Sequence, residues 1–190
     1  FTDPRFEPLG ELSGRVALSP LQLSSPDAIR TNRVNLDEQE ALRPPSEFLA
    51  MREIASFLDD CVRGSEGRVV LVGYNSSRFD LPYLRTSLIR NGINPYFGGK
   101  LVYRDLLLVS RRLATRGLLR PSAGDDPTKL SLSLERVSSH LGLLEGAQEH
   151  EARADVVLTI AVARSLRDRF GLDVGSYEPY EGAGAEPRTE

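Results

Sequence analysis

The sequence predicts an α/β domain in which helices flank a mixed β-sheet. Compact apolar runs alternate along the chain with segments whose apolar residues recur at the spacing of an α-helix. A short β-like opening precedes this alternation. Strands that alternate with helices are typical of α/β domains. The chain has 190 residues, of which 40% are hydrophobic and 27% charged, enough apolar material for a folded core.

The first part of the chain carries short and irregular signals. β-like segments at residues 1–2 and 15–18, separated by a turn rich in proline and glycine, predict a β-hairpin. Residues 24–45 are polar and irregular, and they hold at most a short helix over residues 37–42. No internal repeat is visible here or elsewhere in the chain.

A long helix and a strand follow this opening. Residues 46–62 predict an amphipathic helix, and Ser46, directly after two prolines, suits its N-cap. Residues 68–74 form a compact apolar run rich in β-branched side chains, which predicts a strand covered on both faces. The apolar face of the helix is formed by Met51, Ile54, Ala55, Leu58, Cys61 and Val62.

A loop over residues 75–79 separates that strand from the next predicted helix. Asp80 suits the N-cap of this helix, Pro82 its first turn, and Gly92 the turn after its end. The apolar face of the helix is formed by Leu81, Leu84 and Leu88.

The remaining elements continue the alternation. Residues 100–103 predict a short strand, and Asp105 opens a helix that runs to about residue 114. Residues 116–128 predict a loop. The apolar spacing of Leu134, Val137 and Leu141 predicts a helix that ends at Gly142, and residues 149–170 form the last and longest helix.

The composition indicates the domain organisation and the cellular compartment. Residues 1–172 form one domain, and residues 173–190, rich in Pro, Gly and Glu and without a period, form an acidic, disordered tail. The single cysteine excludes an internal disulfide, and no apolar run reaches the roughly 18 to 20 residues of a membrane-spanning helix. The first residues lack a signal-peptide pattern. We therefore expect a cytoplasmic protein without a membrane partner.

The charge is unevenly distributed along the chain. The net charge of −3 argues against a protein that coats nucleic acid without selectivity. Residues 100–120 nevertheless hold six basic side chains and one acidic one. This basic stretch could follow the backbone of a nucleic-acid strand, and the alternative is that it forms solvated helix faces.

Two places along the chain carry residues suited to chemistry. Asp80 follows the predicted strand in the loop that opens a helix, where a carboxylate is well placed for a metal ion. The alternative is that Asp80 only caps its helix. His150 and Asp155 can share a site if His150 lies on the loop before the last helix and Asp155 in its first turns. The alternative for this pair is a solvated helix start.

Three other residues are weaker candidates. We expect Asp105 to be an N-cap that could stand behind a metal site. We expect His140 to lie at the surface, because it is off the apolar stripe of its helix, and Cys61 to lie in the core. The sequence contains no glycine-rich phosphate loop, no cluster of zinc ligands, and no serine or cysteine nucleophile with a paired histidine.

The order and spacing of these residues resemble a known family. Tyr74-Asn75-x-x-x-Phe79-Asp80, followed after a spacer by His150-x-x-x-x-Asp155, is similar to the second and third motifs of the DEDDh 3′→5′ exonucleases, which have a ribonuclease-H-like fold. The similarity is closest to the catalytic domain of bacterial exonuclease I and runs to about Arg169. It rests on Gly73-Tyr74-Asn75-x-x-Arg78-Phe79-Asp80, Arg104-Asp105-Leu106-Leu107 and Asp155-Val156-x-x-Thr159-Ile160-Ala161.

One motif of the family has no counterpart. The first motif is Asp-x-Glu on the opening strand, and it supplies two of the four metal-binding carboxylates of the family. The segment Thr2-Asp3-Pro4-Arg5-Phe6-Glu7 has the wrong spacing and the composition of a turn. We therefore expect the opening strand to lie upstream of Phe1, and natural degeneration into an inactive protein is the alternative.

The resemblance implies a metal-dependent 3′→5′ exonuclease that releases nucleoside monophosphates from single-stranded DNA. Asp80 and Asp155 would hold a two-ion site of Mg²⁺ or Mn²⁺ together with the two carboxylates of the first motif. His150 would be the general base that activates water. Asn75, Arg78 and Phe79 would contact the substrate.

Two other functions stay open. One is an RNA-trimming exoribonuclease of the same family, although we expect DNA rather than RNA as the partner. The other is an inactive nucleic-acid-binding or scaffold domain with the same fold. An upstream Asp-x-Glu would favour an enzyme, and its true absence would favour a scaffold. The oligomeric state and the protein partners are not determined by the sequence.

Overall fold

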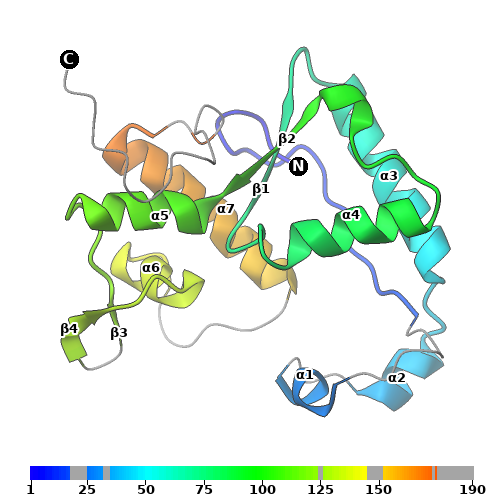
Figure 1. Cartoon of the computed structure of the whole chain (residues 1–190), viewed down its shortest axis with the longest axis horizontal. Coiled ribbons are helices and arrows are strands. Elements are labelled where there is room, and N and C mark those ends of the chain that lie inside the picture. The colour runs from blue at the N-terminus through cyan, green and yellow to red at the C-terminus, as the bar shows by residue number, and fades with distance from the viewer. Residues whose placement is uncertain (18–24, 32–34, 124–125, 145–151, 173, 175–190) are drawn as a thin grey trace. The chain divides into compact units, whose positions relative to one another are not determined.

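The computed structural model describes residues 1–17, 25–31, 35–123, 126–144, 152–172 and 174 (Figure 1). His150 therefore lies outside the described residues, as does almost all of the predicted tail. The described chain divides into two compact units. The first comprises Phe1–Val69 and Pro82–Leu101, and the second comprises Val70–Leu81 and Val102–Glu190.

The first unit is built mainly of helices. It holds α1 (Pro26–Thr31), α2 (Leu36–Ala41), α3 (Glu47–Arg63), the part of α4 (Asp80–Arg90) that begins at Pro82, and the 3₁₀ helix η1 (Phe97–Gly99). Helix α2 confirms the short helix predicted near residues 37–42, with Asn35 as its N-cap. Helix α1 was not predicted, because six residues are too few to show an apolar period.

The predicted opening hairpin is wrong in its second strand. Thr2 forms an isolated antiparallel bridge with Pro8, and residues 15–17 lie in no strand. The reason is local: the side chain of Asp3 accepts hydrogen bonds of 2.8 Å from the backbone N–H groups of both Arg5 and Glu7. These bonds reverse the chain within a few residues, before it reaches the segment that the sequence favoured as the partner strand.

Helix α3 confirms the amphipathic helix predicted over residues 46–62. The hydroxyl of Ser46 accepts a hydrogen bond from the N–H of Leu49, which stabilises the first turn. The guanidinium of Arg90 donates to the carboxylate of Glu47 and lowers the pKa of that carboxyl. The buried residues of this helix, Ala50, Met51, Leu58, Cys61 and Val62, contribute to the core of the first unit.

The second unit contains most of the sheet structure. Strands β1 (Val69–Gly73) and β2 (Leu101–Asp105) are hydrogen-bonded neighbours, and each has only its first residue in the other unit. A second small sheet joins β3 (Ser122–Ala123) and β4 (Asp126–Leu130) in antiparallel pairing. The α/β class is thus confirmed, with two two-stranded sheets among the described residues.

Two expectations about strands are corrected. Only Val69 of β1 is buried, and the rest of the strand is half-buried rather than covered on both faces. Within the described residues β1 pairs with β2 alone, which leaves its other edge without a neighbouring strand. The predicted loop over residues 116–128 contains β3 and the start of β4, which are too short and too polar to show a period of two.

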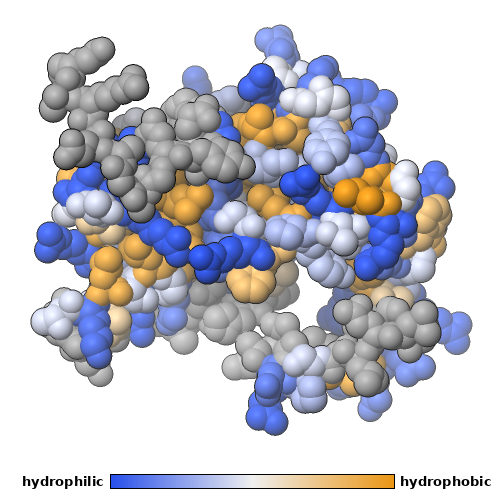
Figure 2. All heavy atoms as spheres, viewed as in Figure 1, coloured by the Kyte–Doolittle hydropathy of each residue, from blue (hydrophilic) through white to orange (hydrophobic). Residues whose placement is uncertain are grey.

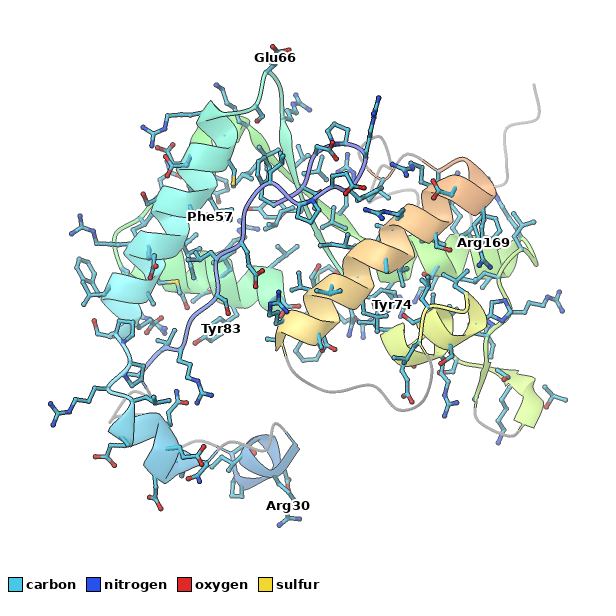
Figure 3. The ribbon with its side chains drawn as sticks, turned by 180° about the vertical axis from the view of Figure 1, so that it is seen from behind. Arg30, Phe57, Glu66, Tyr74, Tyr83 and Arg169 are labelled. Atoms are coloured by element: carbon cyan, nitrogen blue, oxygen red, sulfur yellow. The ribbon has the colours of Figure 1, made fainter. Side chains whose placement is uncertain are left out.

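Three helices form the rest of the second unit. They are α5 (Leu106–Thr115), α6 (Leu134–His140) and α7 (Ala152–Phe170), and α6 packs against both α7 and β3. The guanidinium of Arg169, in the last turn of α7, donates a hydrogen bond of 2.7 Å to the backbone oxygen of Leu141 (Figure 3). The core of this unit is formed by Leu106, Val109, Leu113, Leu119, Val137, Leu141, Leu158, Val162, Ala163 and Leu166.

The surface mixes polar and apolar side chains. Figure 2 shows hydrophilic and hydrophobic residues interspersed over the visible face. Among the described helices, none is long and apolar enough to cross a membrane.

Candidate active site

The candidate site begins in the loop that joins β1 to α4. Asn75 has a φ of 58°, a left-handed conformation that asparagine adopts more readily than most residues. The backbone oxygen of Asn75 accepts a hydrogen bond from the N–H of Arg78, and that of Ser76 accepts one of 2.9 Å from the N–H of Leu81. The chain therefore turns tightly as it passes from the strand to the helix.

The buried carboxylate of Asp105 accepts hydrogen bonds from this loop. Asp105, at the end of β2, is only 5% exposed. One of its oxygens accepts a hydrogen bond of 2.7 Å from the N–H of Asn75, and the other accepts bonds from the N–H and the hydroxyl of Ser77 at 3.0 and 2.6 Å. Asp105 is also the N-cap of α5, as predicted, because its side chain accepts a bond of 3.0 Å from the N–H of Leu107.

Tyr74 fixes the start of the same loop. Its hydroxyl donates a hydrogen bond of 2.7 Å to the backbone oxygen of Leu132, beside the segment that leads into α6 (Figure 3). Burial of the phenol raises the pKa of Tyr74 to about 12, and the negative charge of Asp105 acts in the same direction. The phenol is therefore neutral across the physiological pH range and serves as a hydrogen-bond donor.

The loop presents the predicted site residues at its far end. Asp80 is exposed and is the first residue of α4 itself, whereas the sequence predicted that it would be the N-cap. A carboxylate in the first turn is favoured by the helix dipole. Phe79 is 67% exposed and Arg78 is exposed, while Asn75 is half-buried.

Asp155 lies in the first turn of α7 and is half-buried. Its backbone oxygen accepts a hydrogen bond of 2.7 Å from the hydroxyl of Thr159. Asp80 and Asp155 both belong to the second unit, and the first turn of α7 and the loop after β1 lie at the same end of that unit in Figure 1. His150, the predicted general base, lies outside the described residues.

The donor chemistry of these side chains suits a divalent cation. Carboxylate oxygens are the ligands that Mg²⁺ and Mn²⁺ prefer, and Asp80 is open to solvent. In the part of the chain that the structure describes, no three His, Cys, Asp or Glu side chains gather as a metal site. Asp80 and Asp155 supply two carboxylates of the kind that such a cation prefers.

The weaker candidates behave as predicted. His140 is exposed at the end of α6, and Cys61 is buried in α3. The residue that the sequence did not indicate is Ser77, which belongs to no motif and is bonded to Asp105 by both its backbone and its side chain. Only the fold brings these two residues together, because they are 28 positions apart.

Solved structures of exonuclease I resemble this chain closely. A zinc-bound complex of the Escherichia coli protein with single-stranded DNA aligns with a TM-score of 0.74 and 26% identity, over 90% of this chain and 35% of that one. A complex of the E. coli enzyme with a dT13 oligonucleotide gives a TM-score of 0.73 and 27% identity, over 88% and 36% of the two chains. The chain has the fold of the part of exonuclease I with which it aligns.

The similarity confirms the resemblance that the sequence motifs indicate, since exonuclease I is a DEDDh exonuclease. A further complex of the E. coli enzyme, with a labelled dT13 oligonucleotide, aligns with a TM-score of 0.72 and 26% identity over 90% of this chain. This chain spans about a third of the length of the exonuclease I chains that it matches. No protein-family model matches the chain. No curated protein matches it either.

Proposed function

We propose that this chain is a metal-dependent 3′→5′ exonuclease domain that releases nucleoside monophosphates from single-stranded DNA. The observation that carries the proposal is the alignment of nine-tenths of the chain with exonuclease I structures that hold single-stranded oligonucleotides. The motif residues support it, because Asp80 follows the loop after β1 and Asp155 lies in the first turn of α7. The assay below distinguishes a DNA substrate from an RNA substrate.

Asp80 and Asp155 would hold the divalent cations, with further carboxylates completing a two-ion site. Bound Mg²⁺ or Mn²⁺ supplies charge stabilisation at both ends of an in-line phosphodiester displacement. The exposure of Asp80 leaves its carboxylate accessible from solvent. Asp155 is half-buried in the first turn of the long helix α7.

The remaining site residues would bind the strand and move a proton. His150 would accept a proton from the attacking water, a role suited to a side chain with an unperturbed pKa near 6.5. The exposed ring of Phe79 offers a surface on which a terminal base can stack, and Arg78 offers a positive charge for a phosphate. Asn75 would contribute a side-chain amide next to them.

The proposal is tested with purified protein, including any residues that precede Phe1 in the natural gene product. Single-stranded DNA and RNA of one sequence are each incubated with Mg²⁺, with parallel reactions in EDTA. We expect mononucleotides from DNA, none in EDTA, and slower release from RNA. Absence of Mg²⁺-dependent release from both substrates would contradict the proposal, and faster release from RNA would replace DNA by RNA as the substrate.

Two matched variants identify the source of the activity. Asp155→Ala should lose nearly all metal-dependent release, while Asp168→Ala, on the same helix but exposed and paired with Arg167, should keep it. Retention of more than about 5% of the wild-type rate by Asp155→Ala would overturn the assignment of Asp155, since losing a metal ligand should cost far more. Equal activity in both preparations would indicate a contaminating nuclease.

A further inference from the structure

We propose that Asp105 is a positioning residue that sets the conformation of the loop carrying the candidate site residues. The inference rests on the proposed function and extends it to a residue that does not contact the substrate. Asp105 lies at the junction of β2 and α5 and holds residues 75–77 by three hydrogen bonds.

Both oxygens of the Asp105 carboxylate are engaged in hydrogen bonds. The two oxygens of Asp105 together accept four hydrogen bonds, from Asn75, Leu107 and twice from Ser77. The distance of 2.6 Å from the Ser77 hydroxyl is typical of a charge-assisted bond. Because Asp105 is only 5% exposed, water does not compete for its oxygens while the loop is in place.

The bonds act on the part of the loop that determines where the site residues point. Asn75 is held in a left-handed conformation, and its backbone oxygen accepts the hydrogen bond from Arg78. Ser77 lies two residues before Phe79 and three before Asp80. Loss of the Asp105 contacts would therefore free the loop just before the candidate metal ligand, while β1 on its other side stays paired with β2.

Asp105 also caps α5, so a test must separate capping from positioning. Asp105→Ser does this, because serine is a good N-cap but its side chain is too short to reach the loop as the carboxylate does. Ser77→Ala is a milder second variant that removes one loop contact and leaves Asp105 in place. Ser46→Ala is the matched control, because it removes the N-cap hydrogen bond of α3, in the other unit, and leaves the loop and its contacts unchanged.

Three measurements distinguish positioning from a purely structural role. Amide hydrogen exchange of Asn75 and Ser77, followed by NMR, should be at least 10-fold faster in Asp105→Ser, while the Leu107 amide keeps its protection. The affinity for Mn²⁺, measured by electron paramagnetic resonance without substrate, should fall about 10- to 100-fold, as is common when a residue that supports a metal ligand is lost. In the cleavage assay kcat should fall by a similar factor, with a smaller change in KM.

The outcomes for the variants decide the proposal. Ser77→Ala should change each quantity in the same direction by a smaller factor, and Ser46→Ala should lower stability without changing Mn²⁺ affinity or kcat. Unchanged exchange at Asn75 and Ser77 in Asp105→Ser would overturn the inference, as would faster exchange with wild-type Mn²⁺ affinity. If Asp105→Ser does not fold, the comparison of Ser77→Ala with Ser46→Ala decides, and equal Mn²⁺ affinities of these two variants would also overturn the inference.

The proposed function can be contradicted independently of the role of Asp105. If the wild-type protein binds Mn²⁺ but releases no nucleotides, the exonuclease proposal is contradicted, and the exchange and Mn²⁺ measurements still decide the role of Asp105. If it binds no Mn²⁺, both proposals are contradicted.

Discussion

The side chain of Ser76 lies where a Cβ atom of residue 73 would stand. Gly73 ends β1, and a Cβ built on it would overlap with both the Cβ and the hydroxyl oxygen of Ser76. Ser76 is 4% exposed and cannot move outward without losing its packing. The close approach requires glycine, and it directs the chain into the turn that precedes Asp80.

Gly73→Ala should therefore destabilise the protein by about 1–3 kcal/mol, the usual cost of forcing an extra carbon into a packed site. The matched control is Gly67→Ala, because a Cβ at residue 67 meets no heavy atom within 4 Å and the residue has no positive φ. The control should change the free energy of unfolding by less than about 0.5 kcal/mol. Urea denaturation of both variants measures the difference, and equal midpoints would contradict the packing argument.

The phenol of Tyr74 should titrate well above the usual pKa of tyrosine. Its pKa of about 12 in the folded protein exceeds the value of about 10 of an unfolded tyrosine, so the unfolded chain loses this proton first as the pH rises. The contribution of Tyr74 to stability is complete below about pH 10 and is lost as the pH rises toward 12.

Absorbance at about 295 nm follows this titration, since tyrosinate absorbs there. The difference between wild-type and Tyr74→Phe titration curves should have a midpoint near 12, and a midpoint near 10 would contradict the burial argument. Tyr74→Phe should also lower the free energy of unfolding by about 1 kcal/mol at neutral pH, because the Leu132 oxygen loses its donor.

Basic side chains on and after α5 should contribute to strand binding. Arg111 and Arg116 are exposed, and Arg112 between them is half-buried. If each neutralises one phosphate, changing all three to Gln should reduce the slope of log K against log salt by about 2, at roughly 0.7 per contact for single strands. Fluorescence anisotropy of a labelled oligonucleotide at several salt concentrations measures this slope.

A variant with the same net charge is the control for this measurement. It changes Arg30, Arg52 and Arg63 to Gln, all in the first unit. Arg63 is engaged with Asp59 and Asp60, and Arg52 lies over the ring of Phe48. The control should keep the wild-type slope, and an equal loss in both variants would show only a general charge effect.

Local signals in the sequence predicted most helices to within one or two residues. Ser46 caps α3, Asp105 caps α5, and α6 begins after a serine and ends before Gly142, which has a φ of 72°. These signals work because a cap acts within one turn of the chain. The prediction of the opening hairpin was wrong because the hydrogen bonds of Asp3, rather than apolar residues, determine where the chain reverses.

The places of Asp80 and Asp155 in the first turns of α4 and α7 were predictable from spacing, whereas the tertiary contacts around the candidate site were not. Asp80 and Asp155 follow from motifs at fixed positions relative to a strand and a helix. The hydrogen bonds between Asp105 and Ser77 do not, because nothing in the local sequence at Ser77 requires a partner 28 residues later. Such a contact exists only when β1 and β2 pair.

The direction of degradation tests the central claim most directly. Single-stranded DNA labelled at its 5′ end is incubated with the protein and Mg²⁺, beside the Asp155→Ala variant. The account predicts a ladder of labelled fragments that shorten one nucleotide at a time from the 3′ end, with no ladder from the variant. Immediate release of the labelled 5′ mononucleotide, or no difference between the two proteins, would contradict it.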